Sequence, residues 1–146
     1  MAGTLLFIHL AAAAIWVGGH LVLAIGLLPE ALAKRDPEPI REFERVYEQL
    51  GLPAMAIQVI TGLWLARRLL PEMAAWMDWS NPVARTIDLK IACLAATLAL
   101  AVHARLRVVP TLNADRLPLL GVHIIAVTTL ALVFVWLGVC FRYGGV

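Results

Sequence analysis

Residues 4–28 read TLLFIHLAAAAIWVGGHLVLAIGLL and contain no charged side chain. A stretch of this length crosses the ~30 Å hydrocarbon core of a bilayer as one α-helix. It is longer than the apolar part of a signal peptide, and no basic leader precedes it. We therefore expect a transmembrane helix at this position.

The composition of the whole chain points the same way. Of 146 residues, 62% are hydrophobic and 15% are charged, whereas soluble domains are about 45–50% apolar and about 25% charged. The net charge of +2 argues against a disordered chain, and the balance of acids and bases argues against a nucleic-acid partner. Two cysteines are too few for a disulfide scaffold. The sequence predicts a single domain, residues 1–146, embedded in the lipid bilayer.

Three further apolar segments are long enough to span a membrane, at residues 52–70, 86–109 and 117–141. Unpaired backbone groups are too costly in lipid for anything but helices or a closed barrel, and no ten-residue alternation indicates a barrel. We predict an all-α fold, an integral membrane four-helix bundle in up-down-up-down order.

Apolar residues recur every three or four positions over residues 40–50, which predicts a short amphipathic helix in the first cytoplasmic loop. Gly51-Leu52-Pro53 is expected to separate this helix from the second span.

The distribution of basic residues predicts the orientation of the spans, because lysine and arginine are enriched in cytoplasmic loops. Seven of the twelve basic residues fall in the first and third loops, and five fall on the opposite side. The loop between the second and third spans has no basic residue over residues 71–84. We expect a protein of the bacterial inner membrane with both termini on the periplasmic side.

All four histidines of the chain, His9, His20, His103 and His123, fall inside the predicted spans. Ionisable groups inside a bilayer are costly and usually mark a functional site or pathway. At ~1.5 Å of rise per residue, His20, His103 and His123 share a layer roughly 6–9 Å to the cytoplasmic side, and His9 lies roughly 10 Å to the outer side. His9 and His20 are eleven residues apart, so they share a helix face with Trp16 between them, and we expect Trp16 to contact a bound cofactor with them.

Three interpretations of the inner histidine trio remain open. Two of the three histidines would hold a b-type haem, because imidazole is a common axial ligand of haem iron and bundle cores hold cofactors between facing helices. Alternatively, the trio would bind copper or another transition metal, or form a metal-free network that relays protons. On the outer side, soft ligands for Cu(I) are available near His9. They are Cys93, Cys140, Met73 and Met77.

Other polar residues in the spans have a structural and a functional interpretation. Gln58 would form an interhelical hydrogen bond or orient a ligand histidine of the inner trio. Arg85 and Asp88 are spaced for a helical ion pair, with Lys90 extending to the interface. Alternatively, Arg85 and Lys90, together with Arg67, would contact haem propionates or an anionic substrate.

The chain resembles the CopD-like membrane proteins, named for copper-resistance protein D. The resemblance rests on His9 followed by Trp16-Val17-Gly18-Gly19, on Thr61-Gly62, on Asp88-Leu89-Lys90 and on residues 105–110. A more distant resemblance is to the HemJ-type protoporphyrinogen oxidases. That second resemblance implies that His9 is a haem ligand and that Lys90 is functionally important.

Together these observations favour a membrane b-type haem protein in which histidines hold haem b in the bundle core. It would exchange electrons with a membrane partner, quinone or a porphyrinogen, and as an enzyme it would be a haem-dependent membrane oxidoreductase. The alternative is a copper transport or resistance protein that binds copper through His, Cys and Met. Assembly as a homodimer or in a larger membrane complex is compatible with either function.

Overall fold

The computed structural model describes residues 2–146, and four helical units within that range are long and apolar enough to cross a membrane. They are Gly3–Lys34, Glu38–Leu69, Pro82–Thr111 and Leu117–Tyr143. No strand occurs in this part of the chain. The prediction of an all-α membrane four-helix bundle is confirmed.

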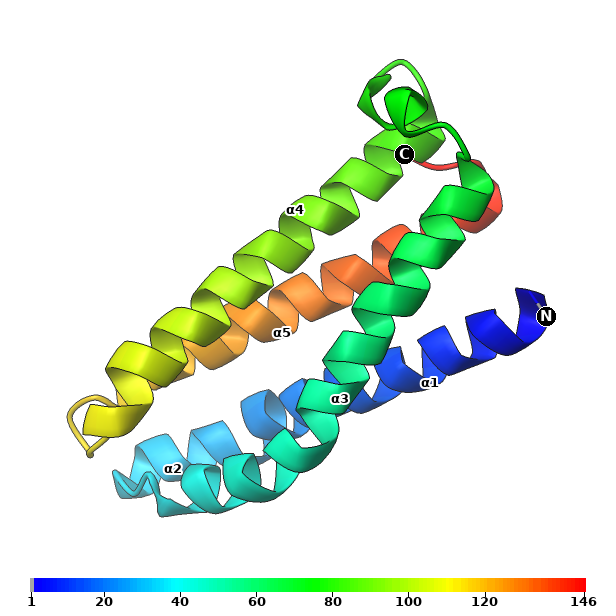
Figure 1. The fold of residues 1–146 in the computed structure, drawn as a ribbon. Helices are drawn as coiled ribbons and strands as arrows, with labels where there is room; N and C mark the ends of the chain where they lie inside the picture. Colours follow the sequence, from blue (N-terminus) through cyan, green and yellow to red (C-terminus); the bar gives the residue numbers. More distant parts are fainter. Residues whose placement is uncertain (1) are drawn as a thin grey trace.

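The four units are built from five α-helices and short π- and 3-10-helical segments. In chain order they are α1 (Ala2–Leu21), η1 (Val22–Leu27), α2 (Leu28–Lys34), α3 (Glu38–Leu69), η2 (Met73–Met77), α4 (Pro82–His103), η3 (Ala104–Val108), η4 (Val109–Thr111), α5 (Leu117–Cys140) and η5 (Phe141–Tyr143). Successive spans run in opposite directions, and both termini lie at the same end of the bundle (Figure 1).

The spans pack as a series of pairs. α3 lies against α1, α1 lies against α5, and α5 lies against α4, and α3 crosses in front of α1 in the view of Figure 1. Most large apolar side chains on the spans are exposed, including Phe7, Ile25 and Ile60. Lipid is as apolar as these side chains, so they need no protein partner, and association rests on close packing and interhelical hydrogen bonds.

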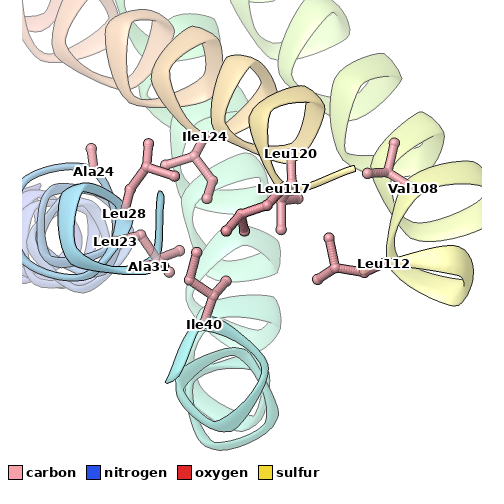
Figure 2. Packing of buried hydrophobic residues seen from close by; sticks show 10 residues of the cluster. All are labelled: Leu23, Ala24, Leu28, Ala31, Ile40, Val108, Leu112, Leu117, Leu120 and Ile124. Carbon is pink, nitrogen blue, oxygen red and sulfur yellow. The ribbon is translucent and has the colours of Figure 1, made fainter. Parts of the chain in front are cut away.

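One apolar cluster closes the bundle at the end opposite the termini. It joins η1 and α2, the first turns of α3, the segment after α4 and the first turns of α5 (Figure 2). Its buried members are Leu23, Ala24, Leu28, Ala31, Ile40, Val108, Leu112, Leu117, Leu120 and Ile124. This cluster fixes the ends of all four spans relative to one another, next to the level of His123.

The amphipathic helix predicted over residues 40–50 is present, but it is not separated from the second span. Both belong to the single helix α3, which continues through Pro53 and bends between its first turns and the span (Figure 1). Proline removes one helical hydrogen bond and commonly bends a helix without ending it. The bend is supported by Tyr47, whose hydroxyl donates to the carbonyl oxygens of Ile15 and Trp16 on α1.

The first span is longer than predicted, because the helical path does not stop at Leu28. A π-helical segment, Val22–Leu27, comes before Pro29, and α2 then begins with this proline in its first turn, where proline is tolerated. The helix ends at Arg35, which has a left-handed backbone with φ of 53°. These longer bounds change the depth at which several polar side chains lie.

Candidate functional site

His103 near the end of α4 and His123 in α5 form a direct pair. Nδ1 of His103 lies 2.8 Å from Nε2 of His123. The two rings are nearly parallel, with an interplanar angle of 9° and centroids 5.0 Å apart. His123 is buried, with 8% of its surface exposed, whereas His103 is exposed at the edge of the bundle.

The hydrogen bonds around the pair define where its protons lie. Nδ1 of His123 is 2.9 Å from the carbonyl oxygen of Leu119, and because a carbonyl only accepts, this nitrogen carries a hydrogen. In the neutral ring, Nε2 of His123 is then an acceptor, and Nδ1 of His103 must donate to it. One proton is therefore shared between two ring nitrogens, one on a fixed ring and one on an exposed ring.

His20, the third member of the predicted inner trio, makes its polar contacts elsewhere. Its Nδ1 donates to the carbonyl oxygen of Trp16 at 2.9 Å, and its ring lies 4.4 Å from the Trp16 ring and 6.0 Å from the Tyr47 ring, centroid to centroid. Its backbone carbonyl oxygen accepts from the Thr128 hydroxyl of α5 at 3.2 Å. Within residues 2–146, no three His, Cys, Asp or Glu side chains are placed to hold one metal ion. The structure thus brings two of the three histidines into contact.

His9 on α1 forms a second polar site with α3. Its Nδ1 lies 2.7 Å from the Thr61 hydroxyl oxygen, and its Nε2 lies 3.3 Å from the amide nitrogen of Gln58. The Thr61 hydroxyl donates to the Ile57 carbonyl at 2.5 Å, so it must accept from His9 Nδ1–H, which leaves Nε2 as the acceptor of the Gln58 amide hydrogen. A Cβ on Gly62 would lie 3.2 Å from Cε1 of His9, so this glycine allows the imidazole to approach α3.

Gln58 therefore contacts a histidine, as one interpretation predicted, but the histidine is His9 and not a member of the inner trio. The predicted second span began at residue 52, which placed Gln58 before its middle. The helix runs from Glu38 to Leu69, so Gln58 lies past its middle, on the half nearer the termini. Its Oε1 atom is buried and has no hydrogen-bond partner. Thr61 is a contact of His9 that the sequence alone did not predict. The available signal was its spacing from Gln58, because residues three apart share a helix face.

Lys90 on α4 points toward α5. Its Nζ donates to the carbonyl oxygen of Phe134 at 3.1 Å and lies 4.2 Å from the centroid of the Phe134 ring. A Cβ on Gly138 would lie 3.4 Å from this nitrogen. Lys90 is thus held against a neighbouring helix, whereas the structural interpretation had it extend to the interface.

The remaining basic candidates lie at the end of the bundle that carries the termini. The Arg85 guanidinium donates to the carbonyl oxygens of Trp79 and Val146, each at 2.8 Å, and these bonds take the place of the ion pair predicted with Asp88. Arg67 is exposed on α3. Arg85 therefore ties the second loop to the C-terminus, and Arg67 remains on the surface.

The soft-ligand candidates are dispersed. Cys93 and Cys140 are free thiols and partly buried, and Met73 and Met77 are exposed on η2. Of these, Cys93 on α4 lies one helical turn from Lys90. In the part of the chain that the structure describes, neither cysteine belongs to a group of three or more His, Cys, Asp or Glu side chains that could hold a metal ion.

The His103–His123 pair does not fit a bis-histidine haem as it stands. A haem iron bound by two imidazoles needs the two nitrogens on opposite faces of the macrocycle, about 4 Å apart for metal–nitrogen bonds of about 2 Å. The two nitrogens are in direct hydrogen-bond contact at 2.8 Å. Two surface cavities, of about 510 and about 290 Å³, are lined by other residues and by no histidine. As it stands, the pair fits a shared proton. Any metal ion bound by both nitrogens needs them to separate by about 1 Å, and a haem also needs room for its macrocycle between the two rings.

Comparison with known proteins gives one match. The family model described as copper resistance protein D matches residues 41–141, more than half of the chain. No curated protein and no solved structure matches, and the resemblance to HemJ-type oxidases stays a prediction. The four membrane-spanning helices and this match together show that the chain is an integral membrane protein of the copper resistance protein D (CopD) family.

Proposed function

We propose that this protein handles copper within the membrane and that it binds Cu(I), as cargo, between His103 and His123. The observation that carries the proposal is the contact of the two ring nitrogens at 2.8 Å, between two different spans. When the His103 ring carries its hydrogen on Nε2 instead of Nδ1, it stays neutral, and two lone pairs face each other and repel. A cation that imidazole binds well, such as copper, restores the attraction.

The two rings are suited to bind a metal ion once the hydrogen of His103 has moved from Nδ1 to Nε2. His123 is buried, and its Nδ1–H bond to the Leu119 carbonyl holds the ring with Nε2 facing His103. Metal-ligand histidines are commonly oriented in this way by a hydrogen bond at the other ring nitrogen. His103 is exposed, so its ring is free to move. With metal–nitrogen bonds of about 2 Å, the nitrogens need to separate by only about 1 Å.

The number of available ligands favours Cu(I) over a divalent ion. Structural zinc sites take four protein ligands and catalytic ones three, whereas Cu(I) accepts two. No third His, Cys, Asp or Glu joins the pair among residues 2–146. Two neutral imidazoles also leave a single positive charge in the bundle, which limits the cost of placing the ion at this depth.

His9 is a second position at which we propose contact with copper, nearer the termini. Its Nε2 is an acceptor turned toward α3, and the Thr61 hydroxyl holds the ring in that tautomer. The two histidine sites lie on opposite sides of the middle of the bundle. Copper that crosses the membrane would meet them in turn.

The proposal is tested by Cu(I) competition titration against a chromophoric chelator, using the full-length protein in detergent. We expect His103→Gln and His123→Gln to weaken binding by at least 10–100-fold, the loss that even outer-shell partners of a metal site produce. His20→Gln is the matched control, because His20 contacts Trp16 and Tyr47 instead. Unchanged affinity in both pair variants would contradict the proposal, and an equal loss in His20→Gln would favour a three-histidine site.

A b-type haem with electron transfer to quinone or a porphyrinogen stays the competing prediction. The reduced-minus-oxidised absorbance spectrum of the same preparation distinguishes it. A Soret and α-band lost on histidine substitution would support haem and count against Cu(I) as the occupant of the pair.

A further inference from the structure

A groove on α3 lies on the surface of the bundle, near the end that carries the termini. Its volume is about 510 Å³, and it is lined by Ile60, Leu63, Trp64, Arg67 and Arg68. These residues recur every three or four positions, so they form one stripe along the helix. The stripe is exposed, with 65% of Ile60 and 62% of Trp64 accessible, whereas the opposite side of α3 contacts His9 on α1.

The groove is apolar along its length and cationic at one end. Arg67 and Arg68 are both exposed, and neither takes part in the four ion pairs that form among residues 2–146. Glu72, the nearest following acid, pairs with neither arginine. Two adjacent guanidinium groups therefore face outward at the end of a span without a counter-charge from the described chain.

We infer that this groove binds an anionic phospholipid. Guanidinium groups bind phosphate oxygens through paired hydrogen bonds, and basic residues beside a span attract anionic lipid. Ile60 and Arg68 are eight residues apart, about 12 Å along the helix, so an acyl chain bound at Arg67 and Arg68 would extend over Leu63 and Ile60. Trp64, between them, has the amphipathic ring that is enriched at the level of the headgroups.

The chemistry of the groove selects one class of lipid. A zwitterionic headgroup carries its own cation, which two guanidinium groups repel, whereas phosphatidylglycerol carries only the negative charge. A free phosphate ion would use the arginines but leave Leu63 and Ile60 uncovered. The inference does not depend on the proposed copper function, because no hydrogen bond joins a groove residue to a histidine in the described structure.

The test is native mass spectrometry of the full-length protein in detergent, titrated with phosphatidylglycerol or with phosphatidylcholine of the same acyl chains. We expect the first phosphatidylglycerol to bind tightly, and Arg67→Gln/Arg68→Gln to weaken it roughly 30-fold, about fivefold for each arginine. Phosphatidylcholine should bind weakly to both proteins. Inorganic phosphate at the same concentration should not displace the lipid.

A matched double variant, Arg45→Gln/Arg107→Gln, removes two exposed arginines that do not line the groove and should keep the first site. An equal loss in this variant would show diffuse attraction and overturn the inference. Equal binding of the two lipids, or displacement by phosphate, would also overturn it. Because the groove residues are exposed, the variants should fold.

Discussion

The substitution Thr61→Val tests the contact between α1 and α3 on which the geometry of His9 depends. Valine keeps the branched shape of threonine but lacks the hydroxyl, which accepts from His9 Nδ1–H at 2.7 Å and donates to the Ile57 carbonyl at 2.5 Å. The Ile57 carbonyl keeps its helical bond, whereas Nδ1–H of His9 loses its acceptor. The expected effect is therefore the cost of one unsatisfied donor.

Two estimates bound this cost. A fully buried donor without a partner costs about 1–3 kcal/mol, whereas interhelical hydrogen bonds in membranes average about 0.6 kcal/mol and reach about 1.7. His9 is only partly buried, so the membrane value applies more closely. We expect Thr61→Val to lower the free energy of unfolding by about 1 kcal/mol, roughly a fivefold change in the folded-to-unfolded ratio.

The assay is reversible unfolding in mixed micelles, followed by circular dichroism. Thr61→Ser keeps the hydroxyl and should retain most of the stability. Thr129→Val is the matched control, because the exposed Thr129 hydroxyl bonds only to the carbonyl of Ile125 in its own helix, and its effect should stay within about 0.5 kcal/mol. The reasoning is refuted if Thr61→Val and Thr129→Val cost the same, or if a double-mutant cycle of Thr61→Val with His9→Ala shows no coupling.

Three further substitutions test other contacts by the same unfolding assay. Gly19→Ala places a Cβ against the ring of Tyr47, so it should cost about 1–3 kcal/mol, and adding Tyr47→Ala should remove most of that cost; a neutral Gly19→Ala would contradict the packing. Lys90→Met removes the hydrogen bond to the Phe134 carbonyl and the contact of Nζ with the Phe134 ring, so it should lower the free energy of unfolding by about 1–2 kcal/mol; an unchanged stability would show that these contacts do not hold Lys90 against α5. Glu48→Gln breaks an exposed ion pair with Arg105 at 2.8 Å and should cost less than about 1 kcal/mol; a larger cost that persists in high salt would be inconsistent with an exposed pair.

The spans were predictable because they depend on composition alone. Uncharged stretches such as residues 4–28 have no alternative to a helix in lipid. The ends of the helices were not predictable in the same way. Pro53 and Pro29 predict helix boundaries. In the structure, α3 bends but continues through Pro53, and a π-helical segment before Pro29 joins α1 to α2 without a break.

The candidate site was predictable in part. Counting residues along each helix gives the depth of a side chain but not its direction around the bundle. Depth therefore grouped His20 with His103 and His123, and only packing shows that His103 and His123 face each other while His20 faces Trp16. The pairing of Gln58 with His9 was missed because it depended on where α3 begins.

The central claim, Cu(I) between His103 and His123, is tested most directly by X-ray absorption at the copper edge of the Cu(I)-loaded protein. We predict one Cu(I) per chain with two nitrogen neighbours at about 2 Å, imidazole scattering, and loss of this signal in His103→Gln and His123→Gln but not in His20→Gln. Copper bound mainly by sulfur, or an imidazole signal unchanged in both pair variants, would contradict the claim.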